Sequence, residues 1–153
     1  MKPTDLIATA RRLAKATGKP RQTDLKRAVS TAYYAVFHAM CRNTADMLIG
    51  STKSARSQPA WLQAYRAIDH GQAKNQCKNG TIKRFPKDVE DFAALFIEAQ
   101  DARHRADYDP GSRFTRSEVL VLIKRVEEAI SAFQRVPKSD RRAFAAFVVL
   151  KFR

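Results

Sequence analysis

Apolar residues recur at every third or fourth position along most of this chain, which is the spacing of an amphipathic helix. Prolines, glycines and short polar stretches interrupt the pattern. Helices are therefore expected over residues 4–18, 23–48, 59–70, 87–108 and 115–137. Thr4 is the expected cap of the first helix, and Thr115 with Glu118 forms a capping box for the last. Residues 72–86 are expected to hold one short helix or none.

The same pattern predicts an all-α fold, an antiparallel helical bundle of five to seven helices. Strand-like alternation, internal repeats and linkers are absent from the sequence, and 153 residues can bury one core without disulfides or metal. Residues 1–137 are expected to form the bundle. Residues 138–153 form a basic and apolar helical extension of the same domain, which can dock on the bundle, cover a second copy or touch anionic lipid.

Charge narrows the choice of partner. Lys and Arg number 29 against 15 Asp and Glu, a net charge of +14, so a polyanion is expected, with nucleic acid first and anionic membrane second. The basic stretch between residues 72 and 86 is the best candidate for a mobile nucleic-acid contact, through Lys74, Lys78, Lys83 and Arg84. No apolar stretch reaches the length of a membrane span, so no membrane insertion is expected. Two cysteines without a paired motif favour the cytoplasm.

The longest expected helix, residues 23–48, carries two stripes. One consists of small residues, Ala28, Ala32, Ala35 and Ala39, so another helix can approach closely along it. The other is polar and consists of Arg27, Thr31, Tyr34 and His38. This polar stripe lines a cleft, or Tyr34 and His38 are simply buried with hydrogen-bond partners.

Candidate chemistry gathers at residues 102–110, where a helical pattern ends at Pro110. Helical spacing puts Arg103 on the same side of the helix as Asp107, and His104 on the same side as Tyr108. Such a group of arginine, histidine, carboxylate and phenol is typical of a functional site. The simpler interpretation is a solvated ion pair between Arg103 and Asp107, which stabilises little.

Two segments together resemble the HEPN domain, a small helical family of prokaryotic toxin–antitoxin and defence systems. Residues 32–39, Ala-Tyr-Tyr-Ala-Val-Phe-His-Ala, are similar to the Tyr-Tyr-Ala-x-Phe-His stretch of its long helix. Residues 103–108 resemble the Arg-x-x-Ala-Asp-Tyr ending of a later helix in one branch of the family. The resemblance covers residues 4–133 and implies a HEPN-like bundle that works as a homodimer on RNA.

Members with an Arg-x4-6-His motif are metal-independent ribonucleases, and this chain departs from that motif. Tyr108 follows Arg103 with four residues between them, where the family histidine would be, and the three histidines are His38, His70 and His104. A tyrosine with a pKa near 10 is a poor base at neutral pH, although it remains a usable acid or donor. His104, one turn earlier, is a candidate for a displaced base, while Arg103 holds the phosphate.

The resulting hypothesis assigns roles to three groups of residues. The candidate catalytic residues are Arg103, His104 and Tyr108. The candidate substrate-binding residues are Arg105, Asp107, Tyr34, His38 and Arg27. The candidate nucleic-acid contacts are the four basic residues of the 72–86 stretch. No metal or organic cofactor is expected, because the histidines are scattered and a glycine-rich phosphate loop is absent from the sequence.

Three functions stay open at this point. The first is an RNA-directed protein of a toxin–antitoxin or defence system, with or without metal-independent endoribonuclease activity. The second is a non-catalytic partner module that binds a nucleotidyltransferase or antitoxin, or binds nucleic acid without cleaving it. The third is a small-ligand or nucleotide-binding bundle with Tyr34, His38 and Arg103 in its pocket.

Overall fold

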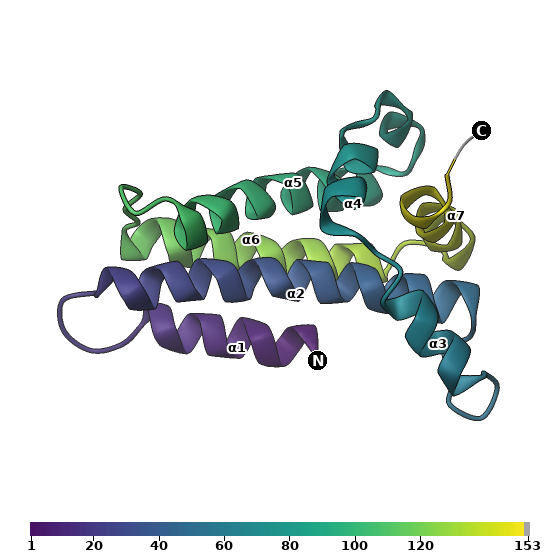
Figure 1. Cartoon of the computed structure of the whole chain (residues 1–153), viewed down its shortest axis with the longest axis horizontal. Helices are drawn as coiled ribbons and strands as arrows, with labels where there is room; N and C mark the ends of the chain where they lie inside the picture. Colours follow the sequence, from purple (N-terminus) through teal and green to yellow (C-terminus); the bar gives the residue numbers. More distant parts are fainter. Residues whose placement is uncertain (152–153) are drawn as a thin grey trace.

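A computed structural model describes residues 1–151 and confirms the all-α fold. Within that range the chain forms seven α-helices and one 3-10 helix, packed as a bundle without strands (Figure 1). The elements are α1 (Pro3–Ala14), α2 (Gln22–Leu48), α3 (Gln58–Tyr65), α4 (His70–Lys78), η1 (Gly80–Arg84), α5 (Lys87–Tyr108), α6 (Arg116–Gln134) and α7 (Lys138–Val149). None of these helices has the length and apolarity needed to cross a membrane.

Helix α2 runs through the middle of the bundle (Figure 1). Helix α1 folds back along one side of it, while α5 and α6 lie along the other side in opposite directions (Figure 1). The alanine stripe of α2 is buried, with Ala28, Ala32 and Ala35 fully covered. Side chains this small let neighbouring helices come close, as the spacing predicts.

Several helix boundaries have a local cause. The capping box of α6 is present, because the Thr115 side chain accepts from the Glu118 amide and Glu118 accepts in return from Thr115. The expectation that Thr4 caps α1 is wrong: Thr4 lies inside the helix, and Pro3 occupies its first turn.

The third helix is shorter than its pattern predicts. It ends at Tyr65 rather than near residue 70. The side chain of Asp69 accepts a hydrogen bond from the Gln72 amide at 2.9 Å, and this cap starts a separate helix, α4, at His70. Most of the 72–86 stretch is therefore ordered as α4 and η1.

Arg116 ties the start of α6 to the end of α1. Its guanidinium donates to the carbonyl oxygens of Ala14, Ala16 and Gly18 at 2.8–2.9 Å. Ala14 is the last residue of α1, and its carbonyl has no partner within the helix, so the arginine satisfies it and complements the negative end of the helix dipole. The other two carbonyls belong to the turn that follows, which the same side chain fixes.

The C-terminal segment docks on the bundle. Helix α7 packs against α2 and α4, and it buries Phe144 and Phe147 against Phe85 of the loop before α5. Deeper in the core, Phe92 and Phe133 stack with ring centroids 4.3 Å apart. Residues 152 and 153 of the expected extension lie outside the described part of the chain.

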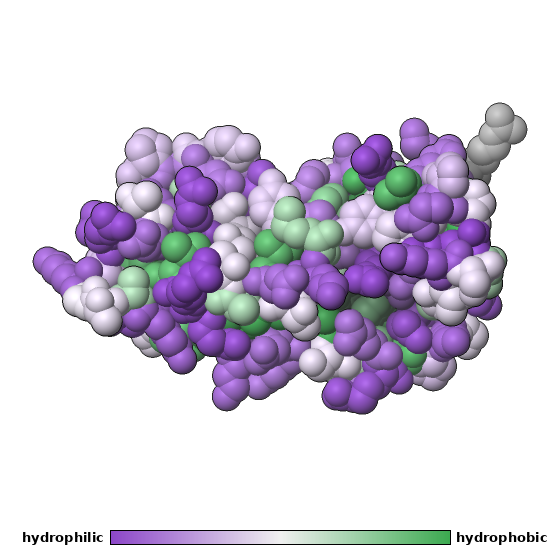
Figure 2. Space-filling view, turned by 90° about the horizontal axis from the view of Figure 1, so that it is seen from below, coloured by the Kyte–Doolittle hydropathy of each residue, from purple (hydrophilic) through white to green (hydrophobic). Residues whose placement is uncertain are grey.

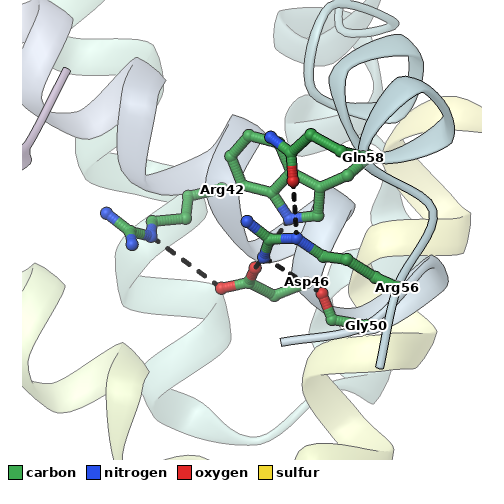
Figure 3. Close-up of polar contacts among 6 residues, drawn as sticks. Arg42, Asp46, Gly50, Arg56 and Gln58 are labelled. Atoms are coloured by element: carbon green, nitrogen blue, oxygen red, sulfur yellow. Dashed lines mark hydrogen bonds and ion pairs between the residues drawn. The ribbon is translucent and has the colours of Figure 1, made fainter. Parts of the chain in front are cut away.

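Polar contacts, rather than a buried apolar face, hold α3 to the end of α2. The Arg56 side chain is only 8% exposed and lies over the Trp61 ring, 4.2 Å from its centroid. One carboxylate oxygen of Asp46 accepts from both the Arg56 guanidinium, at 3.4 Å, and the Trp61 indole, at 2.9 Å. Arg56 also donates to the Gly50 carbonyl and to Gln58 (Figure 3).

Gly50 makes this arrangement possible. Its φ of +147° lies in a region that side chains disfavour, and a Cβ there would meet the Arg56 Cβ at 3.1 Å. The chain can therefore turn sharply after α2 and bring Arg56 back over Asp46.

We predict that Asp46→Ala destabilises the protein by about 1–3 kcal/mol, because it leaves a covered guanidinium and an indole N–H without their acceptor. Urea unfolding followed by circular dichroism measures the change. Asp91→Ala is the matched control, since Asp91 is exposed and pairs only with its helix neighbour Lys87. Equal unfolding midpoints for the two variants would contradict the role given to Asp46.

Candidate functional site

The two segments that resemble the HEPN motifs meet in space. Arg103, near the end of α5, donates from Nη2 to the Tyr34 hydroxyl of α2 at 3.0 Å. Its Nε donates to Asp107, one turn further along α5, at 2.9 Å. Ser30 of α2 donates to the same Asp107 oxygen at 3.3 Å. The Arg103–Asp107 pair is thus joined to a second helix and is more than a solvated surface pair.

Arg103 is held in one orientation. Its side chain is 17% exposed, and its Cζ lies 5.4–5.7 Å from the ring centroids of Tyr33, Tyr34 and Tyr108. Burial acts to lower the pKa of Arg103, but the oxygens of Tyr34 and Asp107 outweigh it and hold that pKa above its ordinary value. The guanidinium is a permanent cation among aromatic rings.

A groove of about 630 Å³ opens beside this cluster, between the first half of α2 and the end of α5. Lys26, Arg27, Thr31 and Tyr34 line it from α2, and Asp107 lines it from α5. Arg103 is not part of the lining but is hydrogen-bonded to Tyr34 and Asp107, which are. Of the residues in the predicted polar stripe, His38 is the one that does not reach the groove lining.

His38 lies outside the groove, and its side chain contacts α3 instead. Its Nδ1 lies 2.5 Å from the Tyr65 hydroxyl of α3. Burial, together with the positive N-terminus and His70, lowers the pKa of His38, while burial raises the pKa of Tyr65 to about 12. The phenol is therefore the donor and the neutral imidazole the acceptor.

His70 belongs to the surroundings of Arg103, a placement that the sequence reasoning missed. As the first residue of α4 it stacks on Phe37, with ring centroids 3.9 Å apart, and its Nδ1 is hydrogen-bonded to the buried Tyr33 hydroxyl. Burial and then the charge of Arg103 lower the pKa of His70. The only sequence signal for this position is Asp69, whose cap turns the chain back toward α2.

The hydrogen bond to Tyr33 also selects a tautomer of His70. Burial raises the pKa of Tyr33, so the phenol keeps its proton and donates it to Nδ1. A neutral imidazole that accepts at Nδ1 carries its hydrogen on Nε2. His70 is thus a hydrogen-bond donor at its other nitrogen near neutral pH, and not a base there.

The remaining cluster residues divide between two faces of α5. His104 and Tyr108 are exposed, with ring centroids 5.0 Å apart, and Tyr108 is 63% exposed. Arg105 points away from Arg103, because two helical positions correspond to about 200° of rotation. Its guanidinium lies over the Phe114 ring at 5.6 Å and lines a different hollow between α5 and α6.

Of the four basic residues expected to contact nucleic acid, none lines the groove, and three lie far from it. Lys74 of α4 forms an ion pair with Asp101 of α5. Lys78, Lys83 and Arg84 are exposed around η1, which leads into the first turn of α5, whereas the groove lies at its last turn. Helix α5 has 22 residues, so its first and last turns lie about 33 Å apart.

Among residues 1–151, no three His, Cys, Asp or Glu side chains group closely enough to hold a metal ion. What the Arg103 cluster offers chemically is therefore a fixed guanidinium, two phenols and an imidazole donor. These are groups that bind and orient an anion.

The two buried histidine contacts predict a pH dependence of stability. Because the folded protein lowers the pKa of His38 and His70, the unfolded chain binds more protons, so stability present above about pH 6.5 is lost as the pH falls toward the folded values. Urea midpoints measured between about pH 7.5 and about pH 5.5 should fall, and less so in His70→Gln. The exposed His104→Gln variant is the control, and an identical fall in all three proteins would contradict this account.

Comparison of the chain with protein-family models, with characterised proteins and with solved structures finds no match. Function has to be inferred from the groove and its side chains.

Proposed function

We propose that this chain is a HEPN-type, RNA-directed protein of a prokaryotic toxin–antitoxin or defence system. The observation that carries the proposal is the hydrogen bond between Arg103 and Tyr34, which joins the two motif segments at the edge of a groove with Lys26 and Arg27. The net charge of +14 supports a polyanionic partner.

Arg103 is the phosphate-binding group in this proposal. A guanidinium has five N–H donors, and Arg103 uses one on Asp107 and one on Tyr34, so about three are left for a phosphate. The two occupied donors fix its plane before RNA arrives, which reduces the entropy lost on binding. Lys26 and Arg27 supply further positive charge, since Asp107 offsets that of Arg103.

Metal-independent cleavage is the second function, and one observation favours it. His104 and Tyr108 are accessible side by side next to Arg103, so an imidazole and a phenol can flank the phosphate that Arg103 holds. His104 takes the proton from the ribose 2′-hydroxyl, and Tyr108 protonates the leaving 5′-oxygen. His38 and His70 are bound to phenols and do not serve as bases.

We expect Arg103→Ala to weaken the binding of single-stranded RNA about tenfold or more, because charge-assisted hydrogen bonds contribute about 1.5–3 kcal/mol each. Fluorescence anisotropy at several salt concentrations measures the affinity and its salt slope, which should be steep. Arg12→Ala removes the same charge from the exposed face of α1 and is the control. RNA binding that is unchanged in Arg103→Ala would refute the proposal.

Cleavage is tested separately, with a chelator present. The wild-type protein is expected to cut RNA and leave 2′,3′-cyclic phosphate ends, while His104→Gln should bind RNA normally and cut much more slowly. If RNA stays intact at high wild-type concentration while binding still depends on Arg103, the function is binding without cleavage.

A further inference from the structure

An open groove follows the seam between α5 and α6. It consists of two hollows, of about 370 Å³ and about 450 Å³, which share Arg125 as a lining residue. One lies beside the first half of α5 and the second half of α6, and the other lies beside the opposite halves of these helices. We call the two hollows together the α5–α6 groove. It shares no lining residue with the groove beside Arg103.

The floor of the α5–α6 groove is apolar. Ala94, Ala129 and Ala132 line one half of it, and Val121 and Leu122 line the other half. Val121 is 55% exposed, so it offers apolar surface that a partner can remove from water. The face on the α1 side of the bundle, by contrast, shows separate hydrophobic patches among hydrophilic residues (Figure 2). The alanines of the floor also let an approaching helix come close.

The charge of the α5–α6 groove differs from that of the chain as a whole. Lys and Arg outnumber Asp and Glu by 29 to 15 in the sequence. In the lining of the groove the balance is reversed, because five carboxylates stand against three guanidinium groups. The carboxylates are those of Asp88, Asp91, Glu98, Glu118 and Glu128, and the guanidinium groups are those of Arg105, Arg113 and Arg125. A net negative surface repels RNA, so this groove fits a protein partner better.

The charges are sorted along the groove. Asp91 and Glu128 belong to its acidic end, and Arg105 and Arg113 belong to its basic end. Neither arginine forms an ion pair with another of the residues 1–151. The two carboxylates pair only with exposed lysines of their own helices. Such surface pairs stabilise little, so these carboxylates can turn to a partner.

We propose that the α5–α6 groove binds the same groove of a second copy of this chain, turned by a two-fold axis so that the two grooves run in opposite directions. The acidic end of each copy then lies on the basic end of the other, and both contacts form at once. The axis passes near the middle of the groove, where Arg125 and Glu98 form two bonds at 2.6 and 2.7 Å. Each copy thereby supplies the order of charges that the other needs, and the two apolar floors cover each other.

This pairing differs from the dimer that the HEPN resemblance implies, in which the paired motifs share one cleft. Arg105 lines the α5–α6 groove, and Arg103 lies about 200° away around α5. The groove beside Arg103 therefore stays accessible in each copy. The pairing does not depend on the proposed function, because none of its contacts involves the Arg103 cluster.

Sedimentation equilibrium of the full chain tests the proposal. The wild-type protein is expected to approach twice the chain mass as its concentration rises. Two double variants, Asp91→Lys with Glu128→Lys and Arg105→Glu with Arg113→Glu, each place like charges opposite one another. Each should raise the dimer dissociation constant about tenfold or more. An equimolar mixture of the two should dimerise as the wild-type protein does, because every altered end then meets an end of opposite charge.

Two controls separate the groove from other causes. Arg12→Glu with Lys15→Glu makes the same change of charge as the arginine variant, at exposed positions of α1, and should dimerise normally. Arg103→Ala alters the other groove and should also dimerise normally. A monomeric wild-type protein, charge reversals without effect, or a mixture that stays monomeric would each overturn the proposal, and so would loss of the dimer in either control.

Discussion

The close approach of other helices to α2 is the constraint on which the rest of the structure depends. Ala28, Ala32 and Ala35 are completely covered, and a larger side chain at any of them would push a neighbouring helix outward. The 3.0 Å bond between Tyr34 and Arg103 spans α2 and α5, so it exists only while those helices keep their present separation. The small residues of the core thus fix the geometry of the polar cluster beside them.

The long elements could be predicted because each has several turns of apolar periodicity. Helices α2, α5 and α6 lie where the pattern places them, and the Thr115 capping box is present. Short helices offer few periodic positions, so local hydrogen bonds decide them. That is why Asp69 divides the expected 59–70 helix in two, and why Pro3 rather than Thr4 occupies the start of α1.

The candidate site was only partly visible in the sequence. Arg103 and Asp107 are neighbours on one helix, so their spacing reveals them, and the family resemblance brings in Tyr34. His70 reaches the site through contacts with Phe37 and Tyr33, more than thirty residues away, and periodicity cannot reveal such a contact. In both phenol–imidazole pairs burial raises the pKa of the tyrosine and lowers the pKa of the histidine. The phenol therefore donates to the imidazole, and both groups stay neutral.

The bonds from Arg116 to the end of α1 have a consequence for how the chain reaches this structure. About a hundred residues separate the partners, so α1 and the turn after it leave the ribosome long before the Arg116 side chain that binds them. Until α6 has been synthesised, the carbonyls of Ala14, Ala16 and Gly18 can be satisfied only by water. The turn that follows the first helix should therefore be among the last parts of the chain to reach its final arrangement.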